Sequence, residues 1–140
     1  MANYYATARS NYFAVKDEQA FREWADGLGL MILEPSDVSE DLIDRFGISP
    51  GDDDDGGGWP TTMADDETGD CEDIDVAYQL AAHLADNEVA ILMEAGSEKL
   101  RYIIGWADAV NNKGEHVILA LESIYESARA LGTNITRAEY

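Results

Sequence analysis

The chain has 140 residues, a formal net charge of −20, 46% apolar residues and a single cysteine. A chain of this length builds one core, so we expect a single domain over residues 1–140. So strong a negative charge repels nucleic acid and anionic membranes, which excludes direct binding to either from the expected functions.

The lone Cys71 permits no internal disulfide and no cysteine-based zinc site. The N-terminal residues show no basic region followed by a long apolar run, and no window approaches about eighteen consecutive apolar residues. We therefore expect an intracellular, cytoplasmic protein that does not span a membrane.

The first expected elements are a strand and a helix. Tyr4 to Val15 is rich in aromatic and β-favouring residues without a helical stripe, which predicts a strand. Asp17 predicts a helix N-cap, and Gly29 predicts the end of that helix. The apolar positions between them follow the spacing i, i+3, i+4, i+7, and they are Phe21, Trp24, Ala25 and Leu28.

A short strand and an ambiguous segment come next. The apolar run Leu30 to Leu33, stopped by Pro35, predicts a buried strand. The segment Ser36 to Pro50 is compatible with a helical turn and, over Arg45 to Ser49, with a strand. We favour a short helix followed by a strand.

The middle of the chain carries most of the charge. Between Arg45 and Lys99 there is no basic residue and there are fifteen acids, eleven of them in an acidic, glycine-rich segment inserted over residues 51–75. Gly51 to Asp73 predicts a long loop or a mobile hairpin rather than a packed element. Trp59 and Pro60 are expected to pin its middle to the body, because burying an indole removes a large apolar area from water.

The second half predicts a helix, three antiparallel strands and a final helix. Asp75 is placed to cap a helix, and the last helical face closes at Gly132. The apolar faces of these two helices are Ala77, Leu80, Ala81 and Leu84, and Leu121, Ile124, Tyr125, Ala128 and Leu131. Between them the pattern predicts strands at Val89–Met93, Leu100–Trp106 and His116–Ala120, with turns at Ala95–Ser97 and Asn111–Gly114.

This order of elements predicts an α+β fold. We expect a mostly antiparallel sheet of about five strands with two to three helices packed on one side, and a long acidic loop or hairpin in the middle.

The residues do not predict an enzyme, a metal site or a cofactor. Counting a calcium-binding loop from Asp52 puts Met63 at the position that needs a glutamate, which leaves only weak, adventitious divalent-ion binding open. The two histidines, His83 and His116, lie in no recognisable catalytic motif. Acids around Cys71 disfavour its thiolate, and the pair Glu94 and Glu98, expected to flank a turn, is better explained as solvated than as an acid–base pair.

The acids themselves indicate a cationic partner. Alternate carboxylates on a strand recur at about 6.6 Å, and acids three or four apart on a helix at about 5–6 Å, so either can follow a row of phosphates. The candidate partner-binding residues are Asp52, Asp53, Asp54, Asp55, Asp65, Asp66, Glu67, Asp70, Glu72, Asp73, Asp75 and Trp59.

Two simpler explanations stay open: a solvated loop, and adaptation to high salt. The second predicts acids over the whole surface, whereas outside the stretch from Phe46 to Glu98 fourteen acids face nine bases, a net charge of only −5.

In length, acidity and expected architecture, and in segments such as ARSNYFAVKD, MEAGSEKLRYIIGWADAVN and GTNITRAEY, the chain resembles small acidic accessory proteins of phages and plasmids. Among these the class it is most similar to is the anti-defence inhibitors, the anti-CRISPR and anti-restriction DNA mimics. The resemblance supplies no site residue.

The resemblance implies a non-enzymatic inhibitor that occupies the basic nucleic-acid-binding groove of a bacterial defence complex, a CRISPR effector or a restriction enzyme. The alternative is a regulatory or scaffold module that binds a protein through exposed faces of Trp59, Trp106 or Tyr102. Its acidity would then serve solubility or high-salt adaptation. The sequence does not indicate an oligomeric state.

Overall fold

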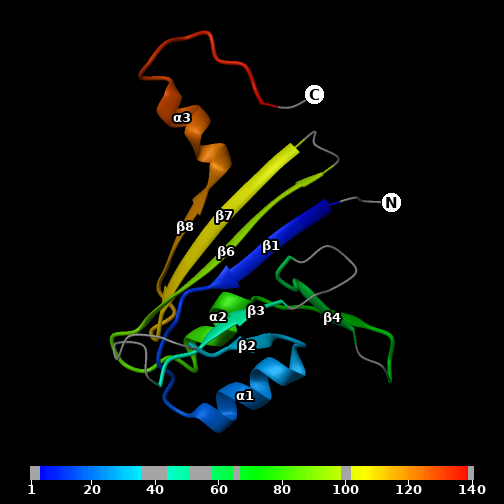
Figure 1. The fold of residues 1–140 in the computed structure, drawn as a ribbon. Coiled ribbons are helices and arrows are strands. Elements are labelled where there is room, and N and C mark those ends of the chain that lie inside the picture. The colour runs from blue at the N-terminus through cyan, green and yellow to red at the C-terminus, as the bar shows by residue number, and fades with distance from the viewer. Residues whose placement is uncertain (1–3, 36–43, 51–57, 65–66, 99–101, 139–140) are drawn as a thin grey trace.

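A computed structural model describes residues 4–35, 44–50, 58–64, 67–98 and 102–138 of the chain, and the fold is α+β as predicted. A four-stranded antiparallel sheet forms one layer, and two helices with a small two-stranded sheet lie against one of its faces (Figure 1). The elements are β1 Tyr4–Ser10, α1 Glu18–Gly27, β2 Met31–Leu33, β3 Gly47–Ser49, β4 Thr62–Ala64, β5 Cys71–Asp73, α2 Val76–Ala81, β6 Val89–Glu98, β7 Tyr102–Asn111, β8 His116–Ala120, the 3-10 helix η2 Leu121–Ser123 and α3 Ile124–Ala128.

The large sheet has the strand order β1-β6-β7-β8, so β1 and β8 are its edges. Side chains alternate between the two faces of a strand, and the register therefore decides which residues share a face. Ser10, Leu92 and Asp108 lie side by side on the face toward the helices, where all three are buried. Only the half of this face nearest the helices is covered, since Tyr102 and Ile104 at its other end are exposed.

The helix α1 forms where its N-cap predicted. The Asp17 carboxylate accepts a hydrogen bond from the Ala20 N–H, and Gly29 follows the helix with a positive φ of 72°. Phe21 is fully buried and packs edge-on against Phe13, with ring centroids 5.8 Å apart. This aromatic contact fixes α1 to the strand-like segment that follows β1.

The helix α2 is also capped as predicted but is shorter. Asp75 accepts a hydrogen bond from the Tyr78 N–H at 3.1 Å, and Val76, Ala77 and Leu80 are buried. The expected helix reached Leu84, whereas α2 ends at Ala81 and the next residues form turns. Leu84 is still buried, because it bridges to Val15 and joins the core from there.

Three strand predictions need correction. The first strand, expected to reach Val15, ends as β1 at Ser10. The turn expected at Ala95 to Ser97 is wrong, because β6 runs unbroken to Glu98 and pairs with β7 throughout. Glu94 and Glu98 therefore do not flank a turn, because both lie within β6. The four-stranded sheet also has one strand fewer than expected, since β2 pairs with β3 in a separate sheet.

The segment between β3 and α2 contains the expected hairpin. β4 and β5 pair antiparallel with Thr62 opposite Asp73. The helix expected after Pro35 falls within residues 36–43 and so lies outside the described residues, whereas the strand expected after it is present as β3.

The last helix does not pack on the sheet face that carries α1 and α2. It continues from η2 beyond the end of β8, as Figure 1 shows in orange. The sequence predicted a helix that closes at Gly132, whereas α3 ends at Ala128 and Leu131 lies in the turn after it. The apolar positions expected on this helix are exposed at Leu121, Ile124 and Leu131.

Candidate functional site

The predicted partner-binding residues divide into two groups. Asp52 to Asp55, Asp65 and Asp66 lie outside the described residues. The structure describes the other six: Trp59, Glu67, Asp70, Glu72, Asp73 and Asp75.

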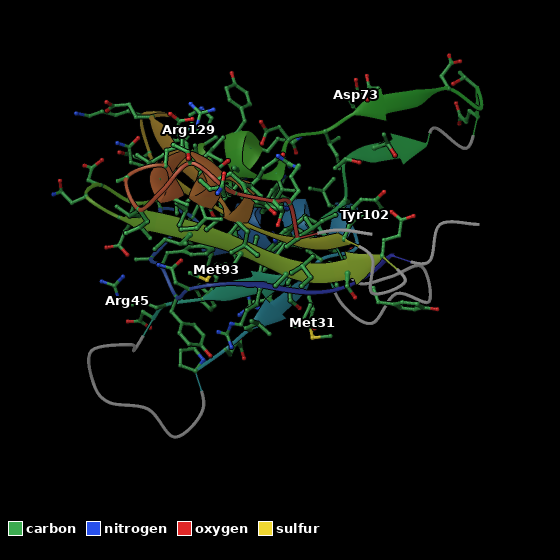
Figure 2. All side chains as sticks on the ribbon, turned by 90° about the horizontal axis from the view of Figure 1, so that it is seen from above. Met31, Arg45, Asp73, Met93, Tyr102 and Arg129 are labelled. Carbon is green, nitrogen blue, oxygen red and sulfur yellow. The ribbon has the colours of Figure 1, made fainter. Side chains whose placement is uncertain are left out.

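Four of these acids share one hairpin, which we call the acidic hairpin and define as β4, β5 and residues 67–70 before β5. Glu67, Asp70, Glu72 and Asp73 are all exposed, and Figure 2 shows the strand that ends at Asp73 extending away from the body. Gly69 has a positive φ of 76°, a backbone conformation that glycine adopts without strain. Among the described residues no ion pair is formed by Asp70, Glu72 or Asp73. Their charge is therefore displayed to solvent.

Asp75 has a different role from the hairpin acids. Its carboxylate caps α2 through the Tyr78 N–H, so it stabilises the fold. It also lies close enough to Asp108 to help raise the pKa of that carboxyl, although burial of Asp108 is the larger cause.

Trp59 anchors the acidic segment as predicted, and it is only 7% exposed. Its indole N–H donates to the Met93 carbonyl at 3.1 Å, and its backbone N–H donates to Glu94 Oε1 at 2.7 Å. The other oxygen of Glu94 accepts from the Trp106 indole at 3.2 Å. The burial of Trp59 contradicts the expectation that it offers an exposed face to a partner.

Glu94 is therefore a structural residue that sequence reasoning placed incorrectly. It projects from β6 toward the helix side of the sheet and ties Trp59 to Trp106. A carboxylate that accepts two N–H groups is well satisfied, so its partial burial is compensated.

The two histidines lie apart from each other. His83 stacks 5.2 Å from Trp24, and burial lowers its pKa, helped by the charge of Lys16. His116 Nδ1 lies 3.3 Å from Asp108 Oδ1, which opposes the rise that burial causes in the Asp108 pKa. Within the described part of the chain, no cluster of three or more His, Cys, Asp or Glu side chains is arranged to hold a metal ion.

The feature that the sequence did not predict is a largely apolar sheet face that the described elements leave exposed. It is directed away from α1 and α2, and we call it the open face. Val117 is 74% exposed, Ile103 69% and Leu119 67%. The register places the following residues on it: Tyr5, Thr7, Arg9, Val89, Ile91, Met93, Ala95, Ser97, Ile103, Gly105, Ala107, Ala109, Asn111, Val117 and Leu119.

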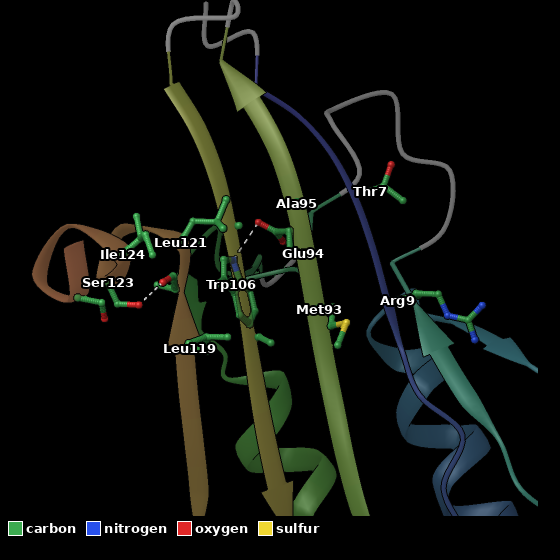
Figure 3. A pocket seen from close by; sticks show the side chains of 14 residues that line it. Thr7, Arg9, Met93, Glu94, Ala95, Trp106, Leu119, Leu121, Ser123 and Ile124 are labelled. Carbon is green, nitrogen blue, oxygen red and sulfur yellow. Dashed lines mark hydrogen bonds between the residues drawn. The ribbon is translucent and has the colours of Figure 1, made fainter. Parts of the chain in front are cut away.

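A groove of about 560 Å³ runs across the open face (Figure 3). Thr7 and Arg9 of β1 lie at one side of it, and Leu121 and Ile124 rise at the other. Gly105 has no side chain at the floor of the groove. Leu121 occupies the space that a Cβ at Gly105 would take.

The signal for this face was the unbroken apolar run from Val117 to Leu119. Successive strand residues point to opposite faces, so a run without alternation requires cover on both. The structure describes cover on neither side of β8, where Ile118 is also exposed.

Comparisons with protein-family models, with curated proteins and with solved structures find no match to this chain. No helix in the described ranges has the length and apolar character needed to cross a membrane.

Proposed function

We propose that this protein is a non-enzymatic, cytoplasmic inhibitor that presents carboxylates to the basic nucleic-acid-binding groove of a bacterial defence complex, such as a CRISPR effector or a restriction enzyme. The observation that carries the proposal is the acidic hairpin. It projects from the body, and three of its four described acids have no ion-pair partner among the described residues.

The physical basis is competition with DNA. Proteins hold duplex DNA with lysines and arginines that replace condensed counterions. Asp70 lies immediately before β5 and Glu72 lies within it, two residues apart, and alternate side chains of an extended chain recur at about 6.6 Å on one face. A row of carboxylates at this spacing offers such a groove the charge that it otherwise takes from phosphates.

The test compares two variants of equal charge. One replaces three hairpin acids, Asp70→Asn, Glu72→Gln and Asp73→Asn. The control replaces three exposed acids on the body, Glu23→Gln, Asp26→Asn and Asp44→Asn. Each variant loses three negative charges from −20 and so has a net charge of −17.

The readout is displacement of a labelled DNA duplex from a purified guide-loaded CRISPR effector and from a restriction enzyme. The hairpin variant should inhibit at least about tenfold more weakly than the control, and inhibition by the wild type should weaken with added salt. Equal inhibition by the two variants would exclude the hairpin as the contact.

The rival is a regulatory or scaffold module that binds its partner through apolar contacts, with the acids serving solubility. The exposure of Tyr102 and Ile103 favours it, whereas the buried Trp59 does not. Tyr102→Ala should then abolish partner binding, and the salt dependence should be shallow. Trp59→Ala is unsuitable for this comparison, because removing a buried tryptophan costs about 3–5 kcal/mol of fold stability.

A further inference from the structure

The open face differs from the rest of this acidic molecule in its charge. The chain has 29 acids, yet none of the residues that the register places on the open face is acidic, and Arg9 is its only charged residue. The Arg9 side chain leans toward the edge of the face, where its guanidinium lies 5.3 Å from the centre of the Tyr12 ring. The face is therefore an apolar surface without carboxylates.

The strand register makes this surface continuous. Tyr5, Ser97 and Ile103 form one row across three strands, and Thr7, Ala95 and Gly105 form the next. Below them Arg9, Met93, Ala107 and Leu119 extend the surface to β8. Large contiguous apolar patches are rare on monomeric proteins and mark interaction surfaces.

A second apolar surface that the described residues leave exposed lies beside it, on η2, α3 and the turn after α3, and we call it the α3 stripe. Leu121 leans over Gly105, whereas Ile124 is 61% exposed and Leu131 is 93% exposed. The residues after α3 fold back on the helix itself, since Tyr125 Oη accepts from the Ala138 N–H at 2.7 Å and Arg137 stacks on the Tyr125 ring. Within the described residues, this segment leaves Ile124 and Leu131 exposed.

We propose that the open face and the α3 stripe together form a homodimer interface, and that their occupant is a second copy of this chain. Both surfaces belong to one chain, so a two-fold axis can place the α3 stripe of each copy at the border of the other's open face. This assignment goes beyond the proposed function and does not depend on it.

Charge favours a second copy over a basic partner at this position. A basic partner gains most from surfaces rich in carboxylates, and the open face has none. Two chains of charge −20 can meet on the open face without setting carboxylates against carboxylates.

The area of the open face is also large enough to supply most of a dimer interface. The four strands have 7, 10, 10 and 5 residues. At about 3.4 Å per residue and about 4.8 Å between strands, they present a face on the order of 500 Å². A stable interface buries about 800 Å² per partner, so the sheet supplies most of this area and α3 supplies the rest.

The test is the mass of the full chain in solution, measured by sedimentation over about 1 to 100 μM. We expect a dimer, twice the chain mass of 15.4 kDa. Leu119→Lys on the open face and Leu131→Lys on the stripe should each weaken dimerisation at least about tenfold, because each buries a charge in place of a large apolar side chain. Both residues are exposed in the single chain, so circular dichroism should show that both variants remain folded.

The matched control is Tyr78→Lys. Tyr78 is 73% exposed on α2, on the opposite side of the sheet, so this variant makes the same charge change without touching the proposed interface. All three lysine variants lower the net negative charge, which rules out added repulsion as the cause of any dissociation. A monomeric wild type at the highest concentration would overturn the proposal. So would a folded Leu119→Lys variant that dimerises like the wild type, or a Tyr78→Lys variant that dissociates equally.

Discussion

At the scale of single residues, Glu94 carries the link between the acidic segment and the sheet. Its two oxygens accept the Trp59 backbone N–H and the Trp106 indole N–H. A glutamine at this position has one acceptor and one N–H₂ donor, so one of the two N–H groups loses its partner. We expect Glu94→Gln to lower the free energy of unfolding by about 1–3 kcal/mol, measured by urea denaturation.

The control for this prediction lies on the same strand. Glu98→Gln makes the same chemical change four residues along β6 on the same face, where the described residues offer its side chain no hydrogen bond. The midpoint of urea denaturation of the Glu98→Gln variant should equal that of the wild type. Tryptophan emission of the Glu94→Gln protein should shift to longer wavelength as Trp59 loosens, and an unchanged midpoint and emission would show that the Glu94 contacts carry no stability.

At the scale of secondary-structure elements, Gly96 explains why a turn was predicted where β6 continues. Ala95, Gly96 and Ser97 have the composition of a turn. In the structure a Cβ at Gly96 would lie 2.3 Å from the Tyr5 carbonyl oxygen, so the glycine allows β1 to lie close to β6. The requirement comes from a strand some ninety positions earlier in the chain, and no local pattern reveals it.

This close approach gives a prediction for strand pairing. Gly96→Ala sets a methyl group against backbone, which cannot rotate away, so we expect a loss of about 1–3 kcal/mol in unfolding free energy. Gly27→Ala is the matched control, because a Cβ there meets nothing within 4 Å, and in a helix it should be neutral or stabilising by up to about 1 kcal/mol. The measurement is the thermal unfolding midpoint of both variants. Equal midpoints would contradict the claim that β1 lies too close to Gly96 for a side chain.

Features that depend on neighbouring residues could be predicted from the sequence, whereas features that depend on distant residues could not. The caps Asp17 and Asp75 act within three residues of themselves, and both helices begin where these residues predicted. Burial of Trp59 was predictable from the cost of an exposed indole, but its partner Glu94 lies 35 residues away and was not. A helix was predicted correctly at Ile124, but α3 ends at Ala128, before the predicted end at Gly132. That α3 lies beyond the sheet instead of against it depends on where η2 ends the edge strand β8.

At the scale of the whole molecule, the acids are distributed unevenly. The acidic hairpin displays exposed carboxylates, while the open face has none. Adaptation to high salt would place acids over the whole surface. The two proposed contacts therefore use different regions of the chain, one acidic and one apolar.

This separation predicts opposite responses to salt. Two copies of charge −20 repel each other at long range, and monovalent salt screens that repulsion, with a Debye length of about 10 Å at 0.1 M. Between about 50 and about 300 mM NaCl, the dissociation constant of the homodimer should therefore fall. Over the same range the proposed complex with a basic groove should weaken, because there the screened interaction is attractive.

Sedimentation equilibrium measures the first response, and DNA displacement from the defence complex measures the second. The variant with three neutral hairpin residues serves as an internal control: its partner binding should lose most of its salt dependence, whereas its dimerisation should still tighten with salt. If dimerisation and partner binding both weakened with salt, carboxylates would be making attractive contacts in both. The open face, which has none, would then not be the surface on which two copies meet.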